Sequence, residues 1–82
     1  MNDYVLTFDS THAALSAQKA LAQAEVSCFT IPTPRAISAG CGIALKIQGE
    51  SVEAVRSLIS RTETRAHWVY LQKNREEFER VL

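Results

Sequence analysis

Strand-like and helix-like hydrophobic patterns follow one another along this chain in an order that few folds accommodate. Alternating apolar residues predict strands, and apolar residues three and four positions apart predict helices. In chain order the patterns predict strand 4–8, helix 11–24, strand 26–31, strand 43–47, helix 51–61 and strand 67–71. This order predicts an α+β fold, the ferredoxin-like βαββαβ sandwich, with an antiparallel four-stranded sheet and both helices on one face.

The chain has 82 residues, which is enough for a single small domain spanning 1–82. The inward faces of two predicted strands follow from their alternation: Tyr4, Leu6 and Phe8 in the first, and Ile43, Leu45 and Ile47 in the third. Asp9 to Thr11 and Ser51 are the candidate helix caps. Residues 74–82 form a short C-terminal tail, in which helical spacing after an Asn74 cap links Phe78, Val81 and Leu82.

The balance of charge argues against nucleic acid as a partner. Lys and Arg together number 9, and so do Asp and Glu, so the net charge is zero. Phosphate binding needs a concentrated excess of positive charge. No apolar stretch approaches the length of a membrane span, and no basic N-terminal region precedes an apolar run. We therefore expect a cytoplasmic protein that has no membrane as a partner.

The two cysteines, Cys28 and Cys41, do not form a disulfide framework. Together with His12 and His67 they are the candidate metal ligands, but none of the four has a close ligand spacing. We predict no metal and no other cofactor. Because Cys28 lies inside an apolar strand, we expect it to serve packing.

The loop between the second and third strands is the candidate functional site. Cys41 lies between Gly40 and Gly42, and small neighbours leave a sulfur open to a partner. Arg35 supplies positive charge of the kind that lowers a thiol pKa, and Ser38 adds a polar side chain to the same loop. We predict that Cys41 is an exposed, reactive thiol.

The predicted topology brings further groups to this loop. The ends of the first two strands and the start of the fourth lie at one edge of a ferredoxin-like sheet. The start of the first helix, with Thr11 and His12, is then expected near Cys41, with Arg65 and His67 at the same edge. Free N–H groups at a helix start favour an anion such as a thiolate. Thr11 and His12 therefore complete the supporting site.

At these residues the chain resembles the selenium/sulfur carrier protein-like family, a small bacterial domain of unknown function. The first matching motif is Pro-x-Pro-Arg-x-Ile-Ser-x-x-Cys-Gly, made here by Pro32, Pro34, Arg35, Ile37, Ser38, Cys41 and Gly42. The second is Phe-x-Ser-Thr-His-x-Ala, made here by Phe8, Ser10, Thr11, His12 and Ala14. The resemblance covers residues 3 to about 72. It implies a role in sulfur or selenium transfer with Cys41 as the carrier.

Three functions remain open from the sequence. The first is a carrier, rather than a turnover enzyme, in which Cys41 accepts sulfur or selenium as a persulfide from a donor protein and passes it to an acceptor protein. The second is a non-catalytic interaction module in which the cysteine is incidental. The third is a thiol redox protein, for which Cys28 and His12 are the available resolving thiol and base. A homodimer through an exposed sheet face or sheet edge is compatible with each.

Overall fold

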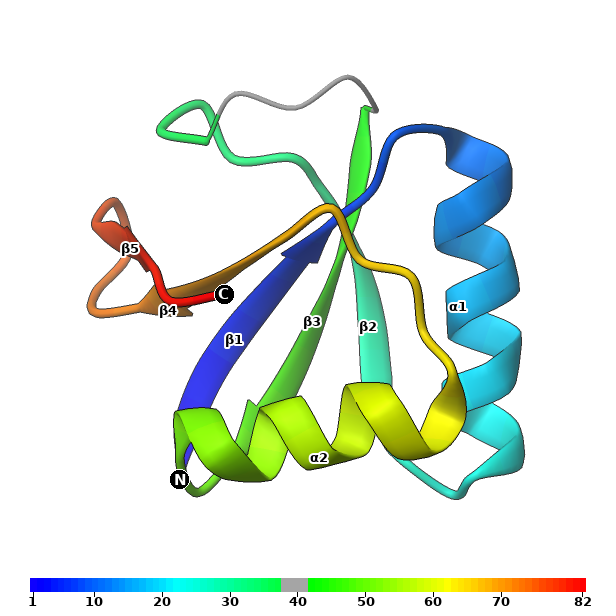
Figure 1. The fold of residues 1–82 in the computed structure, drawn as a ribbon. Coiled ribbons are helices and arrows are strands. Elements are labelled where there is room, and N and C mark those ends of the chain that lie inside the picture. Colours follow the sequence, from blue (N-terminus) through cyan, green and yellow to red (C-terminus); the bar gives the residue numbers. More distant parts are fainter. Residues whose placement is uncertain (38–41) are drawn as a thin grey trace.

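The computed structural model describes residues 1–37 and 42–82 and contains two helices and a five-stranded sheet (Figure 1). In chain order the elements are β1 (Asn2–Thr7), α1 (Thr11–Gln23), β2 (Cys28–Pro32), β3 (Ile43–Gly49), α2 (Val52–Thr62), β4 (Trp68–Gln72) and β5 (Phe78–Arg80). The predicted α+β class is confirmed, and the four strands and two helices predicted over residues 4–71 are present with their ends shifted by no more than a few residues.

All neighbouring strands of the sheet are antiparallel, in the order β2-β3-β1-β4-β5. The central strand, β1, is paired on one side with β3 and on the other with β4. The outer strands are β2 and β5. Residues Tyr4 to Thr7 of β1, and Phe8 directly after it, are all buried.

The predicted count of four strands is wrong, because the tail forms a fifth strand rather than a helix. The Asn74 Oδ1 accepts hydrogen bonds from the backbone N–H groups of Glu76 and Glu77, at 3.0 Å each, and so closes a turn instead of capping a helix. The Lys73 N–H donates to the Glu77 carbonyl at 2.9 Å, and Phe78 then pairs with Gln72. The turn returns the chain along β4.

The apolar side chains of the tail explain why the strand is preferred. Phe78 packs against a cluster on one face of the sheet, whereas Val81 and Leu82 pack against the main core on the other. The Val81 N–H donates to the Val69 carbonyl at 2.8 Å. Residues three apart, such as Phe78 and Val81, lie on opposite faces of an extended chain but on the same side of a helix.

Both helices pack on the same face of the sheet, where they form the main core. This cluster contains Tyr4, Leu6, Phe8, Ala14, Ala17, Leu21, Leu45, Ile47, Val55, Leu58 and Val69. The predicted inward residues of β1 belong to it, as do Leu45 and Ile47, while Ile43 is partly buried at its margin. The small buried residues Ala14 and Ala17 let α1 lie close to the sheet.

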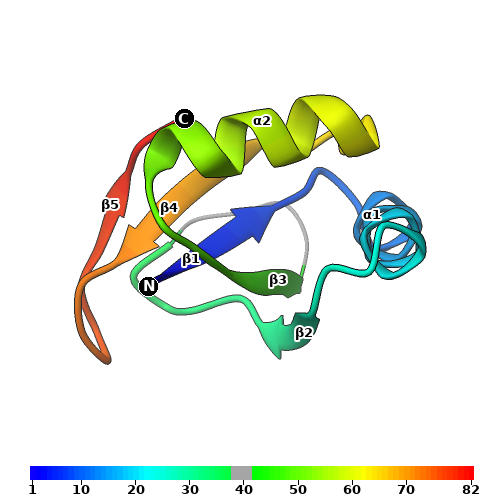
Figure 2. The same ribbon diagram turned by 90° about the horizontal axis from the view of Figure 1, so that it is seen from below.

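Within the part of the chain that the structure describes, no helix packs on the opposite face of the sheet, which the loop after β2 covers in part. Ile37 of this loop, 4% exposed, forms a second cluster with Val5 and Ala44. Ile31, Tyr70 and Phe78 pack around it. Figure 2 shows the two helices on one side of the sheet and segment 33–37 on the other.

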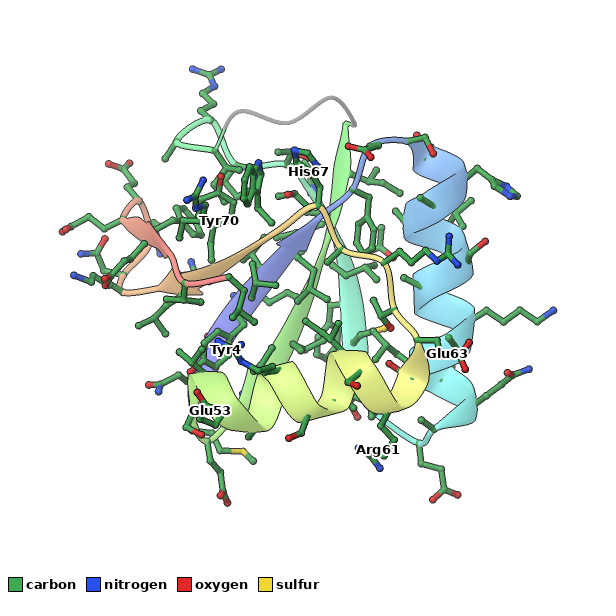
Figure 3. The ribbon with its side chains drawn as sticks, viewed as in Figure 1. Tyr4, Glu53, Arg61, Glu63, His67 and Tyr70 are labelled. Atoms are coloured by element: carbon green, nitrogen blue, oxygen red, sulfur yellow. The ribbon has the colours of Figure 1, made fainter. Side chains whose placement is uncertain are left out.

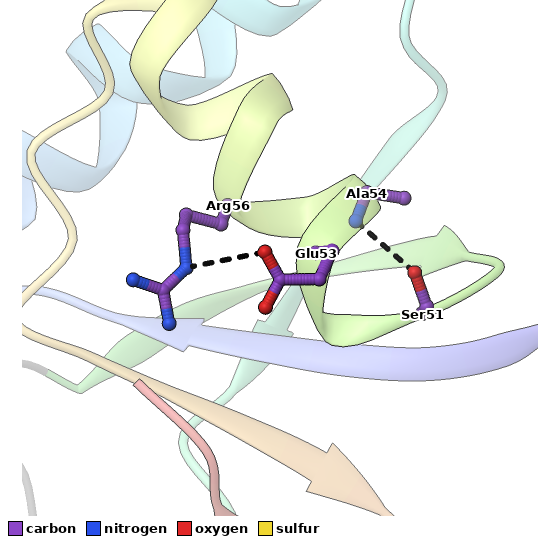
Figure 4. Close-up of polar contacts among 4 residues, drawn as sticks. All are labelled: Ser51, Glu53, Ala54 and Arg56. Carbon is purple, nitrogen blue, oxygen red and sulfur yellow. Dashed lines mark hydrogen bonds and ion pairs between the residues drawn. The ribbon is translucent and has the colours of Figure 1, made fainter.

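Serine side chains cap both helices. The Ser10 Oγ accepts a hydrogen bond from the Ala13 N–H at 3.1 Å, and the Ser51 Oγ accepts one from the Ala54 N–H at 3.2 Å (Figure 4). The cap of α1 is thus the middle residue of the predicted Asp9–Thr11 set. In α2, Glu53 adds a negative charge to the first turn, where the helix dipole favours it.

Gly49, at the end of β3, is required by close packing rather than by its backbone angles. A Cβ atom there would lie 2.8 Å from the Val55 Cγ2 and 3.3 Å from the Tyr4 Cε2. We expect Gly49→Ala to lower the free energy of unfolding by about 1–3 kcal/mol, the usual cost of overpacking. Urea unfolding measures this loss. The matched control is Gly42→Ala, because a Cβ at Gly42 meets nothing within 4 Å; equal stability of the two variants would contradict the contact.

Candidate functional site

The ends of β1 and β2 and the starts of β3 and β4 lie at one end of the sheet. Thr7 at the end of β1 is paired with Trp68 at the start of β4. Pro32 at the end of β2 is paired with Ile43 at the start of β3. The predicted site segments, which are distant in sequence, therefore start or end at a common end of the sheet.

Three predicted site residues, Cys41, Ser38 and Gly40, lie outside the described residues. The described chain on either side is held against the sheet. Ile37 is buried in the second cluster, and the Thr33 N–H donates to the Gly42 carbonyl at 3.1 Å, which extends the β2–β3 pairing by one residue pair. The two residues that bound the segment containing Cys41 are thus fixed relative to β2 and β3.

An Asp9–His67 pair lies at this end of the sheet. The His67 Nδ1 is 3.0 Å from the Asp9 Oδ1, and the His67 backbone N–H donates to the Thr7 carbonyl at 2.7 Å. Figure 3 shows His67 where β4 begins. The side chains are 46% and 81% exposed, so this contact contributes little to stability. Its effect is to orient the imidazole, which remains open to a ligand or partner.

The Trp68 ring contacts both the His67 imidazole and the Arg80 guanidinium. The His67 and Trp68 rings meet edge to face with their centroids 4.8 Å apart, and the Arg80 guanidinium lies 4.0 Å from the Trp68 ring centroid. Sequence reasoning placed His67 at this edge but did not include it or Asp9 in the site. The antiparallel pairing of β1 with β4 could have identified the pair, because it places the residues that follow β1 beside those that precede β4.

Arg35 lies on the opposite side of the sheet from the start of α1. It lines an open groove of about 560 Å³ with Pro34, Ala36, Arg75, Glu76 and Phe78, between the loop after β2 and the β4–β5 turn. Figure 1 shows segment 33–37 and α1 on opposite sides of the molecule. The described residues therefore do not bring Arg35 together with Thr11 and His12, and its positive charge is instead beside that of Arg75.

Thr11 and His12 occupy the first turn of α1 and are both exposed. Helix α1 has no acidic residue in that turn, so its N-terminal dipole is not offset there. Arg65 lies in the segment between α2 and β4, beside a more C-terminal part of α1 than the first turn. There it lines a cavity of about 290 Å³ with Ala13, Ser16, Ala17, Ala20, Glu63 and Thr64. The end of the sheet thus carries His12 and the Asp9–His67 pair, while the two arginines diverge from it.

Cys28 serves packing, as predicted. It is partly buried in β2, is paired with Ile47 of β3, and packs against the main core. Burial raises the pKa of the Cys28 thiol because it disfavours the charged thiolate. At neutral pH this thiol is therefore a weaker nucleophile than an exposed cysteine.

Within residues 1–37 and 42–82, no group of three or more His, Cys, Asp and Glu side chains is placed to hold a metal ion. Over the same residues, neither helix has the length and apolar character needed to cross a membrane.

No curated protein and no solved structure matches the chain. A family model described as "Putative Se/S carrier protein-like" matches residues 3–71, from β1 through β4. The match spans most of the chain, including both helices and the candidate site, and leaves out residues 1–2 and residues 72–82 with β5. The chain therefore belongs to the family of Se/S carrier protein-like proteins.

Proposed function

We propose that this protein is a sulfur or selenium carrier in which Cys41 holds the atom as a persulfide and delivers it to an acceptor protein. The observation that carries the proposal is the family match over residues 3–71. Cys41 is the chosen thiol because it lies between two glycines in the loop, whereas Cys28 is a packing residue with a raised thiol pKa.

The proposed transfer is a thiol exchange that needs no external oxidant. The Cys41 thiolate attacks the terminal sulfur of a donor persulfide, forming a new S–S bond as the donor S–S bond breaks. The donor leaves as a thiolate and takes up the proton of the transferred sulfhydryl or of water. An acceptor thiolate then attacks the terminal sulfur of Cys41 in the same way and restores the free thiol. A selenopersulfide donor exchanges by the same steps.

The surroundings of the loop support this chemistry. Ile37 and Gly42, which bound the segment containing Cys41, are fixed on the sheet, so the reactive segment is short and tethered at both ends. The imidazole of His67, oriented by Asp9, and the exposed imidazole of His12 lie at the same end of the sheet, where they supply hydrogen-bonding groups. Arg35 and Ser38 stay in the proposed site as loop residues.

The position of Cys28 favours a carrier over a dithiol redox protein. A resolving cysteine attacks as its thiolate, and burial in β2 reduces the thiolate fraction of Cys28. A carrier also benefits when no competing thiolate is present, because a second reactive thiol would expel the carried atom as a disulfide forms.

The setting of the protein is proposed along with its function. We propose that residues 1–82 form one domain, a ferredoxin-like βαββαβ unit to which β5 adds a strand, and that it works in the cytoplasm. The antiparallel order of β1 to β4 and the packing of both helices on one face support this arrangement. Its partners are a donor and an acceptor protein that carry reactive thiols or selenols.

The pH dependence of alkylation tests whether Cys41 is activated. In a Cys28→Ser variant, the rate of iodoacetamide labelling should rise with a midpoint below about 8.5, the reference pKa of a free thiol. In the matched Cys41→Ser variant, burial of Cys28 should move the midpoint above the usual range of cysteine. Equal midpoints, or labelling of Cys41 only after denaturation, would contradict the proposal.

A further inference from the structure

We propose that two copies of this chain associate through the free edge of β2, so that the two sheets join into one across a two-fold axis. The two outer strands differ in how well they are protected from such pairing. Strand β5 has three residues, of which Glu79 and Arg80 are charged, and short charged edges resist addition of another strand. Strand β2 has five residues and no charge, and it presents Phe29 at 64% exposure. Its edge is therefore the one open to a second strand.

The pairing of β2 with β3 determines which backbone groups its free edge offers. The Thr33 N–H donates to the Gly42 carbonyl, so the backbone of Thr33 is bonded toward β3 rather than toward the free edge. Bonded positions alternate along an antiparallel pair, so Ile31 and Phe29 are bonded toward β3 as well. The backbone groups of Cys28, Thr30 and Pro32 then point to the free edge. Pro32 fits that assignment, because its missing N–H costs no bond to β3.

A second copy of β2 complements this edge in one register. An antiparallel pair related by a two-fold axis that is centred on Thr30 uses the whole strand. Each Thr30 N–H then meets the Thr30 carbonyl of the partner subunit, and each Cys28 N–H meets the carbonyl of Pro32 of the partner subunit. Pro32 accepts this bond but has no N–H to donate to the Cys28 carbonyl of the partner subunit, so each end of the paired strands forms one hydrogen bond instead of two.

The side chains of the edge fit the same register. Phe29 and Ile31 lie on the face of the sheet that carries no helix, since Ile31 packs with the second cluster and Phe29 is two residues away. In the paired strands, Phe29 lies opposite Ile31 of the partner subunit, and Ile31 lies opposite Phe29 of the partner subunit. Cross-strand pairs of aromatic and β-branched residues stabilise antiparallel sheets. The exposed aromatic ring thus gains an apolar neighbour.

Sedimentation equilibrium tests the dimer, with a reductant present so that disulfides play no part. We expect the wild-type protein to have twice the monomer mass at high concentration, and Phe29→Lys to raise the dissociation constant at least about tenfold. The control is Leu15→Lys, which replaces another exposed apolar residue, 50% exposed on α1, and should leave the mass unchanged. A monomeric wild type, or a dimer that Phe29→Lys does not weaken, would overturn the proposal.

Oxidation of a single introduced cysteine tests the register and does not depend on Phe29. In a Cys28→Ser/Cys41→Ser background, Thr30→Cys places two thiols on directly opposed residues about 5.5 Å apart at Cα, within the range of a disulfide. Diamide should oxidise them to a disulfide and be reduced to its hydrazine, and Ser27→Cys should not cross-link, because its copies lie about 20 Å apart along the strands. Equal cross-linking of the two variants would overturn the register. Because Cys41 is absent from this background, failure here leaves the proposed carrier function untouched.

Discussion

Replacement of Cys41 by serine should abolish persulfide formation, the largest effect that the proposed function predicts. Wild-type protein incubated with glutathione persulfide should gain the mass of one sulfur atom, because the Cys41 thiolate takes the terminal sulfur and glutathione leaves. Serine has no nucleophilic sulfur, so the Cys41→Ser variant should gain none. Intact-mass spectrometry of the protein, before and after reduction, measures both the gain and its reversal.

The matched control for this experiment is Cys28→Ser. Because Cys28 packs in β2 with a raised thiol pKa, its loss should leave loading unchanged. Loading of Cys41→Ser at the wild-type level, or loss of loading in Cys28→Ser, would show that a residue other than Cys41 holds the sulfur and would contradict the proposal. Replacing the donor by glutathioselenol, which carries selenium in place of the terminal sulfur, shows which atom the thiol accepts faster.

The fold was predictable wherever its signal is local. Alternation in residues 4–8 and 43–47 and serine caps at Ser10 and Ser51 lie within single elements, and the structure has each of them. The start of β2 was not predictable in this way. The Val26 N–H bonds back to the Leu21 carbonyl at 2.9 Å, while Glu25 adopts a φ of 61°. This helix ending usually requires glycine, so glutamate there gives no sequence signal.

The fifth strand depends on contacts that no spacing in the tail reveals. Phe78 packs with Tyr70 and Ile37, and Val81 and Leu82 reach the main core beside Val69. Helical and extended readings of such a short apolar pattern compete, and tertiary contacts decide between them. The position of Arg35 follows from the same contacts, because the β4–β5 turn forms the other side of its groove.

The candidate site was predictable to the level of topology and no further. The strand order sets the ends of β1 and β2 and the start of β4 at one end of the sheet, as the βαββαβ pattern predicts. The Asp9–His67 pair arises from side chains that the topology brings within reach but that no motif links. The face over which the loop after β2 folds is set by Ile37, whose burial against Val5 and Ala44 takes segment 33–37 away from the helices.

The second large effect is expected from Phe8, which anchors the end of β1 directly before Asp9. Phe8 is 1% exposed and belongs to the main core. We expect Phe8→Ala to lower the free energy of unfolding by about 3–5 kcal/mol, because the apolar contacts are lost and a cavity remains. A domain of this size has a total stability of about 4–12 kcal/mol, so the variant should lie close to unfolding. Urea unfolding followed by circular dichroism measures the loss.

Two comparisons make this prediction specific to the part of the core beside the candidate site. Leu15→Ala removes a half-exposed apolar side chain and should change stability by no more than about 0.5 kcal/mol. Phe8→Leu keeps most of the apolar volume and should lose much less than Phe8→Ala. The amide of His67, which bonds to the carbonyl of Thr7, should exchange its hydrogen faster in Phe8→Ala than in Phe8→Leu. A loss in Phe8→Ala no larger than that in Leu15→Ala would contradict the burial of this ring, and with it the link between the core and the end of the sheet that carries the candidate site.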